Sequence, residues 1–227
     1  NCVAYQQGKK LADIEVAAIS DYLKHKDCFV WVALKDASDE ELLEMQREFG
    51  LHELAVEDAR HGHQRPKIEE YGDTLFVVMH LVEPAGGDLQ VGELAVFVGH
   101  NFVLSVRIGS MVNYLGGRER CEREPELLRT MGPSYCLYAV LDFVVDNYLP
   151  ITNRFRDTLE LLEKDIFADN YRRSTVVRLY ELKRELNKMR MAVAPLQDVL
   201  SALRRYPAET GQVPDEVKLY IRDVHDH

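Results

Sequence analysis

Short apolar stretches separated by turn residues dominate the first half of the chain. Residues 28–34, CFVWVAL, form a continuous apolar run of strand length. Segments 67–71 and 74–82 flank Gly72 and Asp73, which are typical of a tight turn, so they predict an antiparallel hairpin. Similar patterns predict two more hairpins, 2–6 with 11–14 and 93–98 with 102–107. We therefore expect the first half to build a sheet.

Helical spacing dominates after residue 108. A mixed helical region, 111–129, is expected to break at Gly116, Gly117 and Pro125. Two long amphipathic helices, 134–166 and 174–206, should pack as an antiparallel pair across a short polar turn, and a third should follow a loop at 207–214. We expect Ser134 to cap the first long helix and Pro150 to kink or restart it. Their apolar stripes indicate core or subunit contacts rather than a cofactor site.

Helix signals also occur among the strands. Ser38 followed three residues later by Glu41 is a capping box, and Gly50 stands where a helix ends, so 39–49 should be a helix. A second short helix should begin near Leu51. Its apolar side is expected to contain Leu51, Leu54, Ala55 and Ala59, with Glu57 and Asp58 turned off that side. Two carboxylates would then stand together at a helix end that is held against the sheet.

The last helical pattern also separates two kinds of residue. One apolar stripe would contain Val213, Val217, Ile221 and Val224. Acidic and imidazole side chains fall on a different face, at Glu216, Asp223, Asp226 and His227. Basic residues are favoured near a helix C-terminus, whereas here acids accumulate. One face should pack, and the other should offer oxygen atoms.

Charge narrows the choice of partners. The chain has 28 basic and 38 acidic residues, a net charge of −10, which argues against nucleic acid and against anionic membrane surfaces and favours cations. The four scattered cysteines fit buried, reduced thiols better than disulfides or a zinc site. No apolar stretch approaches the roughly 20 residues that a spanning helix needs. The chain lacks an initiator Met and ends within a helical pattern, so we interpret it as a fragment.

Five blocks in order resemble the cytosolic part of the CorA family of magnesium and cobalt transporters. They are VED at 56–58, HQRPK at 63–67, EEYGDTLFVV at 69–78, LKRELNKMR at 182–190 followed by PLQDVLSAL at 195–203, and IRDVHDH at 221–227. The resemblance implies an α+β fold. In it, an α/β/α sandwich with a mostly antiparallel central sheet is followed by long antiparallel helices and the start of a stalk helix.

The same resemblance implies the organisation of the whole protein. Residues 1–132 would be the α/β cytosolic domain, 133–206 a long helical hairpin packed on it, and 207–227 a loop with the start of the stalk helix. A homopentamer is implied in the inner or plasma membrane, with this fragment on the cytoplasmic side. Contact with the membrane would come only through spanning helices beyond residue 227. The function implied is ion transport and not enzymatic catalysis.

The resemblance also carries over a metal site. Asp58 matches the family's principal sensing carboxylate, Glu57 stands beside it, and Asp223 on the next subunit's stalk helix is its implied partner. Binding of Mg²⁺, or Co²⁺ or another divalent cation, between subunits would gate the pore. The chemistry is reasonable, because Mg²⁺ prefers oxygen ligands and usually keeps several waters beside one or two carboxylates.

Two other interpretations stay open at this point. His61 and His63, with Asp58, resemble the metal ligands of a soluble metal-dependent hydrolase, which activates a water molecule. The two histidines, however, follow a helix and precede a proline turn. In such hydrolases the histidine pair is expected at the end of a strand, with further His and Asp ligands later in the sequence. The remaining interpretation is a helical scaffold whose acids are a solvated surface.

Overall fold

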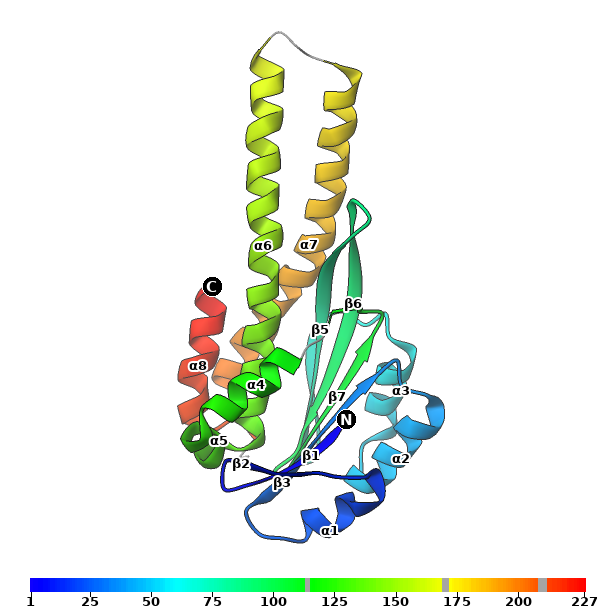
Figure 1. The fold of residues 1–227 in the computed structure, drawn as a ribbon, viewed down its shortest axis with the longest axis vertical. Helices are drawn as coiled ribbons and strands as arrows, with labels where there is room; N and C mark the ends of the chain where they lie inside the picture. Colours follow the sequence, from blue (N-terminus) through cyan, green and yellow to red (C-terminus); the bar gives the residue numbers. More distant parts are fainter. Residues whose placement is uncertain (113–114, 169–171, 208–211) are drawn as a thin grey trace.

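The computed structural model describes residues 1–112, 115–168, 172–207 and 212–227 (Figure 1). Within these residues one seven-stranded sheet has the order β2-β1-β3-β7-β6-β5-β4. Its strands are β1 (Cys2–Gln6), β2 (Lys9–Asp13), β3 (Cys28–Lys35), β4 (Lys67–Tyr71), β5 (Thr74–Ala85), β6 (Asp88–Val98) and β7 (Phe102–Ile108). Among the described strands only β3 and β7 pair in parallel. All three predicted hairpins are confirmed.

Helices cover both faces of this sheet (Figure 1). On one face lie a 3₁₀ turn at Val16–Ala18 and the helices α1 (Ile19–Leu23), α2 (Asp39–Phe49) and α3 (Glu53–His61). On the other face lie α4 (Leu115–Arg123), α5 (Pro125–Met131), α6 (Pro133–Phe167), α7 (Arg173–Arg205) and α8 (Asp215–Asp226). The predicted α+β sandwich, with a mostly antiparallel sheet, long antiparallel helices and a short final helix, is confirmed.

Strand alternation divides the buried side chains into two cores. Side chains alternate across a strand, so Val30 and Val32 of β3 join the core under α1 to α3, whereas Phe29 and Trp31 join the core under α4 to α8. The four cysteines are free and buried, as expected. The sheet therefore separates two surfaces that each carry their own helices.

The capping box predicted for α2 is present. The Ser38 side chain accepts a hydrogen bond from the Glu41 backbone N–H at 3.2 Å, and the Glu41 carboxylate accepts one from the Ser38 N–H at 2.8 Å. Gly50 follows the helix with φ 63°, a left-handed conformation that glycine adopts without a steric penalty. These local contacts fix both ends of α2.

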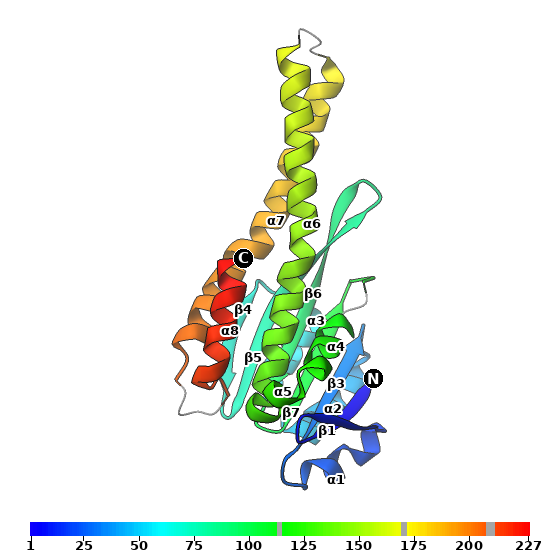
Figure 2. The same cartoon turned by 60° about the vertical axis from the view of Figure 1, so that its left-hand side comes forward.

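Helices α6 and α7 form the longest element, an antiparallel pair that extends well beyond the sheet (Figures 1 and 2). The expected restart at Pro150 is wrong, because α6 continues through it. The expected cap at Ser134 is also wrong: Ser134 lies inside α6, and its hydroxyl donates to the Gln212 carbonyl at 2.6 Å. Part of the apolar stripe of these two helices is exposed, including Leu159 (46%) and Leu186 (45%).

The predicted break at the paired glycines is wrong as well. Gly116 and Gly117 lie inside α4, where a Cβ on Gly116 would come within 2.2 Å of the Phe143 ring of α6. The glycine therefore allows α4 to approach α6 closely. The expected polar turn between α6 and α7, at 169–171, and residues 208–211 of the expected loop lie outside the described residues.

An ionic contact joins α7 to the turn between β5 and β6. Asp88 begins β6, and its carboxylate lies 2.9 Å from Arg184 and 2.9 Å from Lys188, both on α7. Lys188 also donates to the Leu89 carbonyl at 2.8 Å. These contacts connect the long β5–β6 ribbon to the helical pair. No helix in the described part of the chain has the length and apolar character of a membrane span.

Candidate cation sites

Asp58 is placed by α3 and the β4–β5 hairpin. His52 begins α3 by accepting the Leu54 backbone N–H at 3.2 Å, and Ala55, Val56 and Ala59 bury one side of the helix. The prediction that Leu54 belongs to this side is wrong, because its side chain is 52% exposed and Val56 is buried instead. Asp58 is consequently half-buried at the edge between α3 and β4.

A lysine already neutralises this carboxylate. Lys67, the first residue of β4, places its ammonium 2.7 Å from Asp58 Oδ2 and 3.0 Å from Glu69 Oε2. Burial lowers the pKa of Lys67, but the hydrogen bonds to Asp58 and Glu69 outweigh this effect, so the pKa is raised and the lysine stays charged. A metal ion that binds Asp58 through this oxygen must therefore displace Lys67.

Glu57 lies beside Asp58 in α3, on the exposed side of the helix. Its carbonyl oxygen is 3.0 Å from Nδ1 of His61, one helical turn later. Its carboxylate is therefore open to solvent and available to a second molecule. Glu57 and Asp58 together form an acidic edge on the α1–α3 side of the sheet.

Asp223 belongs to the opposite side of the sheet. Helix α8 buries Val217, Ile221 and Val224, as its predicted stripe requires, and leaves Asp223 exposed. Burial raises the pKa of Tyr138 on α6, Arg120 opposes this, and the negative charges of Asp223 and Asp146 add to it. Asp223 thus stands within electrostatic range of α6. The predicted site residues are not brought together within one chain.

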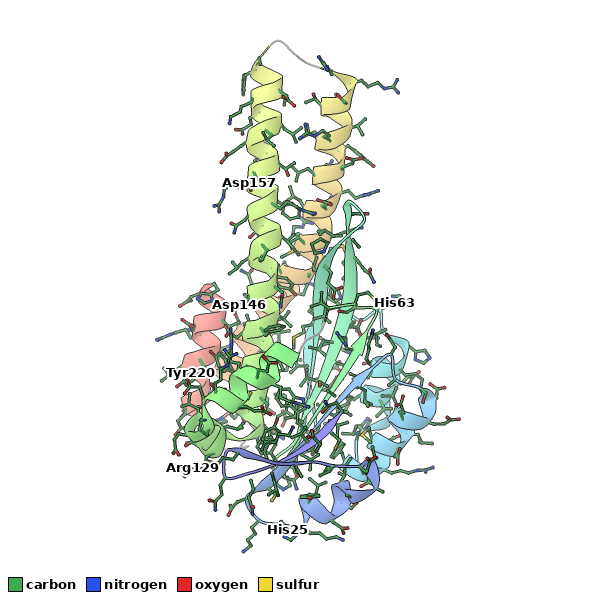
Figure 3. The ribbon with its side chains drawn as sticks, in the orientation of Figure 1. His25, His63, Arg129, Asp146, Asp157 and Tyr220 are labelled. Atoms are coloured by element: carbon green, nitrogen blue, oxygen red, sulfur yellow. The ribbon has the colours of Figure 1, made fainter. Side chains whose placement is uncertain are left out.

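The structure reveals an acidic cluster that the sequence pattern concealed. Ligand atoms of Asp142 and Asp146 on α6 and of His227, after α8, lie within 4.8 Å of one another. Arg120 of α4 is 2.9 Å from Asp146 and also contacts the buried Asp142. Figure 3 shows Asp146 on α6, beside α8. Carboxylates and imidazoles are common divalent-cation ligands, but here Arg120 already pairs with both carboxylates.

One signal could have identified these acids in the sequence. Asp142 and Asp146 are four residues apart and so share one helical face, but they stand inside an apolar run, LDFVVDNY. Its apolar residues predict core or subunit contacts, which draws attention away from the two acids. A buried carboxylate in such a run needs a partner, and nothing local indicates that Arg120 supplies it.

The hydrolase interpretation gains no support from the geometry. His61, His63 and Asp58 do not gather their ligand atoms, and within the described ranges the α6 cluster alone meets the distance expected of a three-ligand group. His61 and His63 are both exposed, and Asp58 is engaged by Lys67. The arrangement that would activate a water molecule is not assembled.

The fold is thus an α+β sandwich with a projecting helical pair, and acidic side chains lie on both sides of its sheet. Residues 26–227 match the family described as CorA-like Mg²⁺ transporter protein, and the chain belongs to that family. The resemblance stated from the five sequence blocks is confirmed. The family is one of transporters.

Relatives and solved structures agree with this assignment. The chain is 31% identical over 183 residues to the cobalt/magnesium transport protein CorA of Thermotoga maritima, covering 79% of this chain and 51% of that protein. It is 27% identical over 197 residues to the putative metal ion transporter YfjQ of Bacillus subtilis, covering 87% of this chain and 60% of that protein. The chain thus spans little more than half the length of these relatives.

Two solved structures share the fold. The complete CorA magnesium transporter of Methanocaldococcus jannaschii superposes with a TM-score of 0.77 at 19% identity, covering 99% of this chain and 68% of that chain. The soluble domain of the same transporter superposes with a TM-score of 0.71 at 21% identity, covering 100% of this chain and 87% of that one. The whole described sandwich and its helical pair therefore belong to one known architecture.

Proposed function

We propose that this chain is the cytosolic regulatory part of a divalent cation transporter, and that Mg²⁺ binding between neighbouring copies holds the copies together and controls the pore. The observation that carries the proposal is the separation of the acids. Glu57 and Asp58 lie on the α1–α3 side of the sheet, and Asp223 lies on the α8 side. In a ring of copies, one side of each meets the other side of the next.

The physical chemistry gives such an interface a cation-dependent stability. Carboxylates facing each other repel by about 1–4 kcal/mol per close pair at effective dielectrics between water and the protein surface. Mg²⁺ between them replaces repulsion by attraction, while retained waters keep each site weak. Summed over a homopentamer, even about 1 kcal/mol per interface approaches the ~5.5 kcal/mol that inverts a two-state equilibrium. Weak sites can therefore gate a pore.

The remaining parts of the proposal follow the family. Residues 1–132 would form the cytosolic α/β domain, 133–206 the helical hairpin, and 207–227 the connection to a stalk helix that enters the inner or plasma membrane. The cargo would be Mg²⁺, with Co²⁺ or another divalent cation as an alternative. Membership of the family supports this cation class.

The test uses the full-length protein in membranes or detergent. Asp58→Ala combined with Asp223→Ala should abolish the protection from proteolysis that Mg²⁺ confers, because both sides of the interface lose their ligands. Asp73→Ala combined with Asp198→Ala is the matched control, since both residues are exposed acids outside the proposed interface residues. Unchanged protection in the first double variant, or equal loss in the control, would contradict the proposal.

A further inference from the structure

A cavity on the α4–α8 side of the sheet is lined by basic side chains. It has a volume of about 430 Å³ and lies between the sheet and helices α4 and α6. Lys35 and Arg107 line it from β3 and β7, and Arg118 lines it from α4. No Asp or Glu is among the described residues that line it. In a chain of net charge −10, such a concentration of positive charge is unexpected.

The sheet brings two of these cations side by side. β3 and β7 are parallel, and their register pairs Ala33 with Ser105 and Lys35 with Arg107. Side chains at alternate positions share a face, so Lys35 and Arg107 stand on the face that carries Trp31 and Ser105. Both side chains therefore reach the cavity from the same face of the sheet.

Arg118 adds a buried charge to the same cavity. Its residue is 7% exposed, and its guanidinium lies 4.8 Å from the centre of the Trp31 ring. One terminal nitrogen donates to the Trp31 carbonyl at 3.2 Å and the other to the Asn1 side chain. Its Nε is buried and has no hydrogen-bond partner among the described residues, and no carboxylate in that part of the chain forms an ion pair with it. A buried guanidinium without a counter-ion is costly.

The cavity also occupies a favourable place in the sheet. Lys35 ends β3, and Arg107 is the penultimate residue of β7. The carboxyl ends of adjacent parallel strands are where open α/β sheets commonly bind ligands. The volume lies within the range of small-molecule sites. Guanidinium groups match tetrahedral oxyanions because their N–H groups form paired, charge-assisted hydrogen bonds.

From these observations we infer that this cavity binds a phosphate-type oxyanion through Lys35, Arg107 and Arg118. The bound anion would accept hydrogen bonds from Lys35 and Arg107 and supply a counter-charge to the buried guanidinium of Arg118. The shared chemistry is a tetrahedral oxyanion, which either free inorganic phosphate or the phosphate group of a nucleoside monophosphate provides.

The protein carries its own reporter, because Trp31 is the sole tryptophan of the chain and contacts Arg118. Inorganic phosphate is titrated into the chain at constant ionic strength while tryptophan emission is recorded, and calorimetry measures the same binding. We expect a saturable change in emission that chloride at equal ionic strength does not produce. Adenosine monophosphate forms a second arm, and tighter binding than phosphate would identify the nucleotide as the source.

Variants at the strand ends decide the assignment. Lys35→Gln with Arg107→Gln should weaken phosphate binding at least about tenfold, because two charge-assisted hydrogen bonds are lost. Lys9→Gln with Arg47→Gln is the matched control, since both are exposed cations outside the lining. Arg118→Gln removes packing on Trp31 together with the charge, so the strand-end pair carries the test. No saturable change in the parent chain, or equal affinity in the strand-end variant, would overturn the inference.

Discussion

The ammonium group of Lys67 lies 2.7 Å from Oδ2 of Asp58, so the carboxylate proposed to sense Mg²⁺ is already paired with a cation of its own chain. Lys67 reaches it from the first residue of β4, in the HQRPK block. On the proposed function, metal binding at Asp58 would be an exchange between this tethered cation and a free one. The strength of the Lys67 pair would then set how much Mg²⁺ the exchange requires.

Replacing this lysine should make the full-length protein more sensitive to Mg²⁺. In Lys67→Gln, the metal no longer competes with an ammonium group, so the Mg²⁺ concentration giving half-maximal protection from proteolysis should fall by about fivefold, the scale of a partly exposed ion pair. Lys10→Gln, which removes an exposed pair with Asp13, should leave it unchanged. A higher requirement for Mg²⁺ in Lys67→Gln would contradict the exchange.

The cluster on α6 makes a prediction about folding stability. Arg120 neutralises the buried Asp142, so Arg120→Gln should lower the free energy of unfolding by about 2 kcal/mol, less than a fully buried pair because Arg120 is partly exposed. Urea denaturation of the isolated chain measures the change. Adding Asp142→Asn to Arg120→Gln should restore much of the loss, since no charge is then left buried. A double variant as unstable as Arg120→Gln would show that the pairing is not the cause.

The contribution of the α2 capping box to stability can be tested by removing one hydroxyl group. Ser38→Ala removes the hydroxyl that accepts the Glu41 N–H and should cost about 1 kcal/mol of stability. Ser174→Ala is the matched control, because Ser174 is exposed in the first turn of α7, where no side chain caps the helix. Thermal unfolding of both variants gives the comparison. Equal effects would indicate that the reciprocal contacts of Ser38 and Glu41 add nothing.

Glu93 makes stability depend on pH. Burial raises the pKa of its carboxyl above the ordinary 4.5, although the backbone N–H of Gln64 donates to it at 2.9 Å. The folded state therefore holds this proton more tightly than the unfolded state. The contribution to stability is complete below pH 4.5 and is lost as pH rises through the folded-state pKa.

Glu93→Gln keeps an acceptor for Gln64 but has no carboxyl to ionise. It should therefore be more stable than the parent chain at neutral pH, and the difference should shrink as the solution is acidified. Urea denaturation across this pH range measures the trend, with Glu70→Gln as an exposed control. If the stability difference between Glu93→Gln and the parent chain grew on acidification, the raised pKa of Glu93 could not be its cause.

Local signals in the sequence predicted the elements well, and contacts between distant segments explain what it did not predict. Ser38 and Glu41 are three residues apart, so their reciprocal hydrogen bonds could be predicted from local spacing. The strands could be predicted because turn residues stand at both ends of each apolar run. Ser134 resembles a cap, but its true partner, Gln212, lies 78 residues away. The glycines of α4 resemble a break in the sequence, but in the structure Gly116 packs against Phe143 of α6, and Gly117 packs against Ala139 and Val140 of the same helix.

The candidate site shows the same division. Asp58 and Asp223 were identified through the family resemblance, whereas the ion pair of Asp58 with Lys67 depends on how α3 packs beside β4. Asp142 was hidden because a carboxylate within an apolar helix face becomes meaningful only when Arg120 of α4 is placed against it. Sequence patterns indicate which residues carry charged or metal-binding side chains. Tertiary packing determines which partners those side chains contact.

The contact of Asp88 with Arg184 and Lys188 gives the projecting helical pair a salt-dependent attachment. Its carboxylate is exposed enough for dissolved ions to screen both cations. Concentrated electrolyte should loosen the ribbon from α7 while leaving the buried sandwich intact. We therefore expect the grip of the β5–β6 ribbon on α7 to weaken as the salt concentration rises, whichever ion supplies the salt.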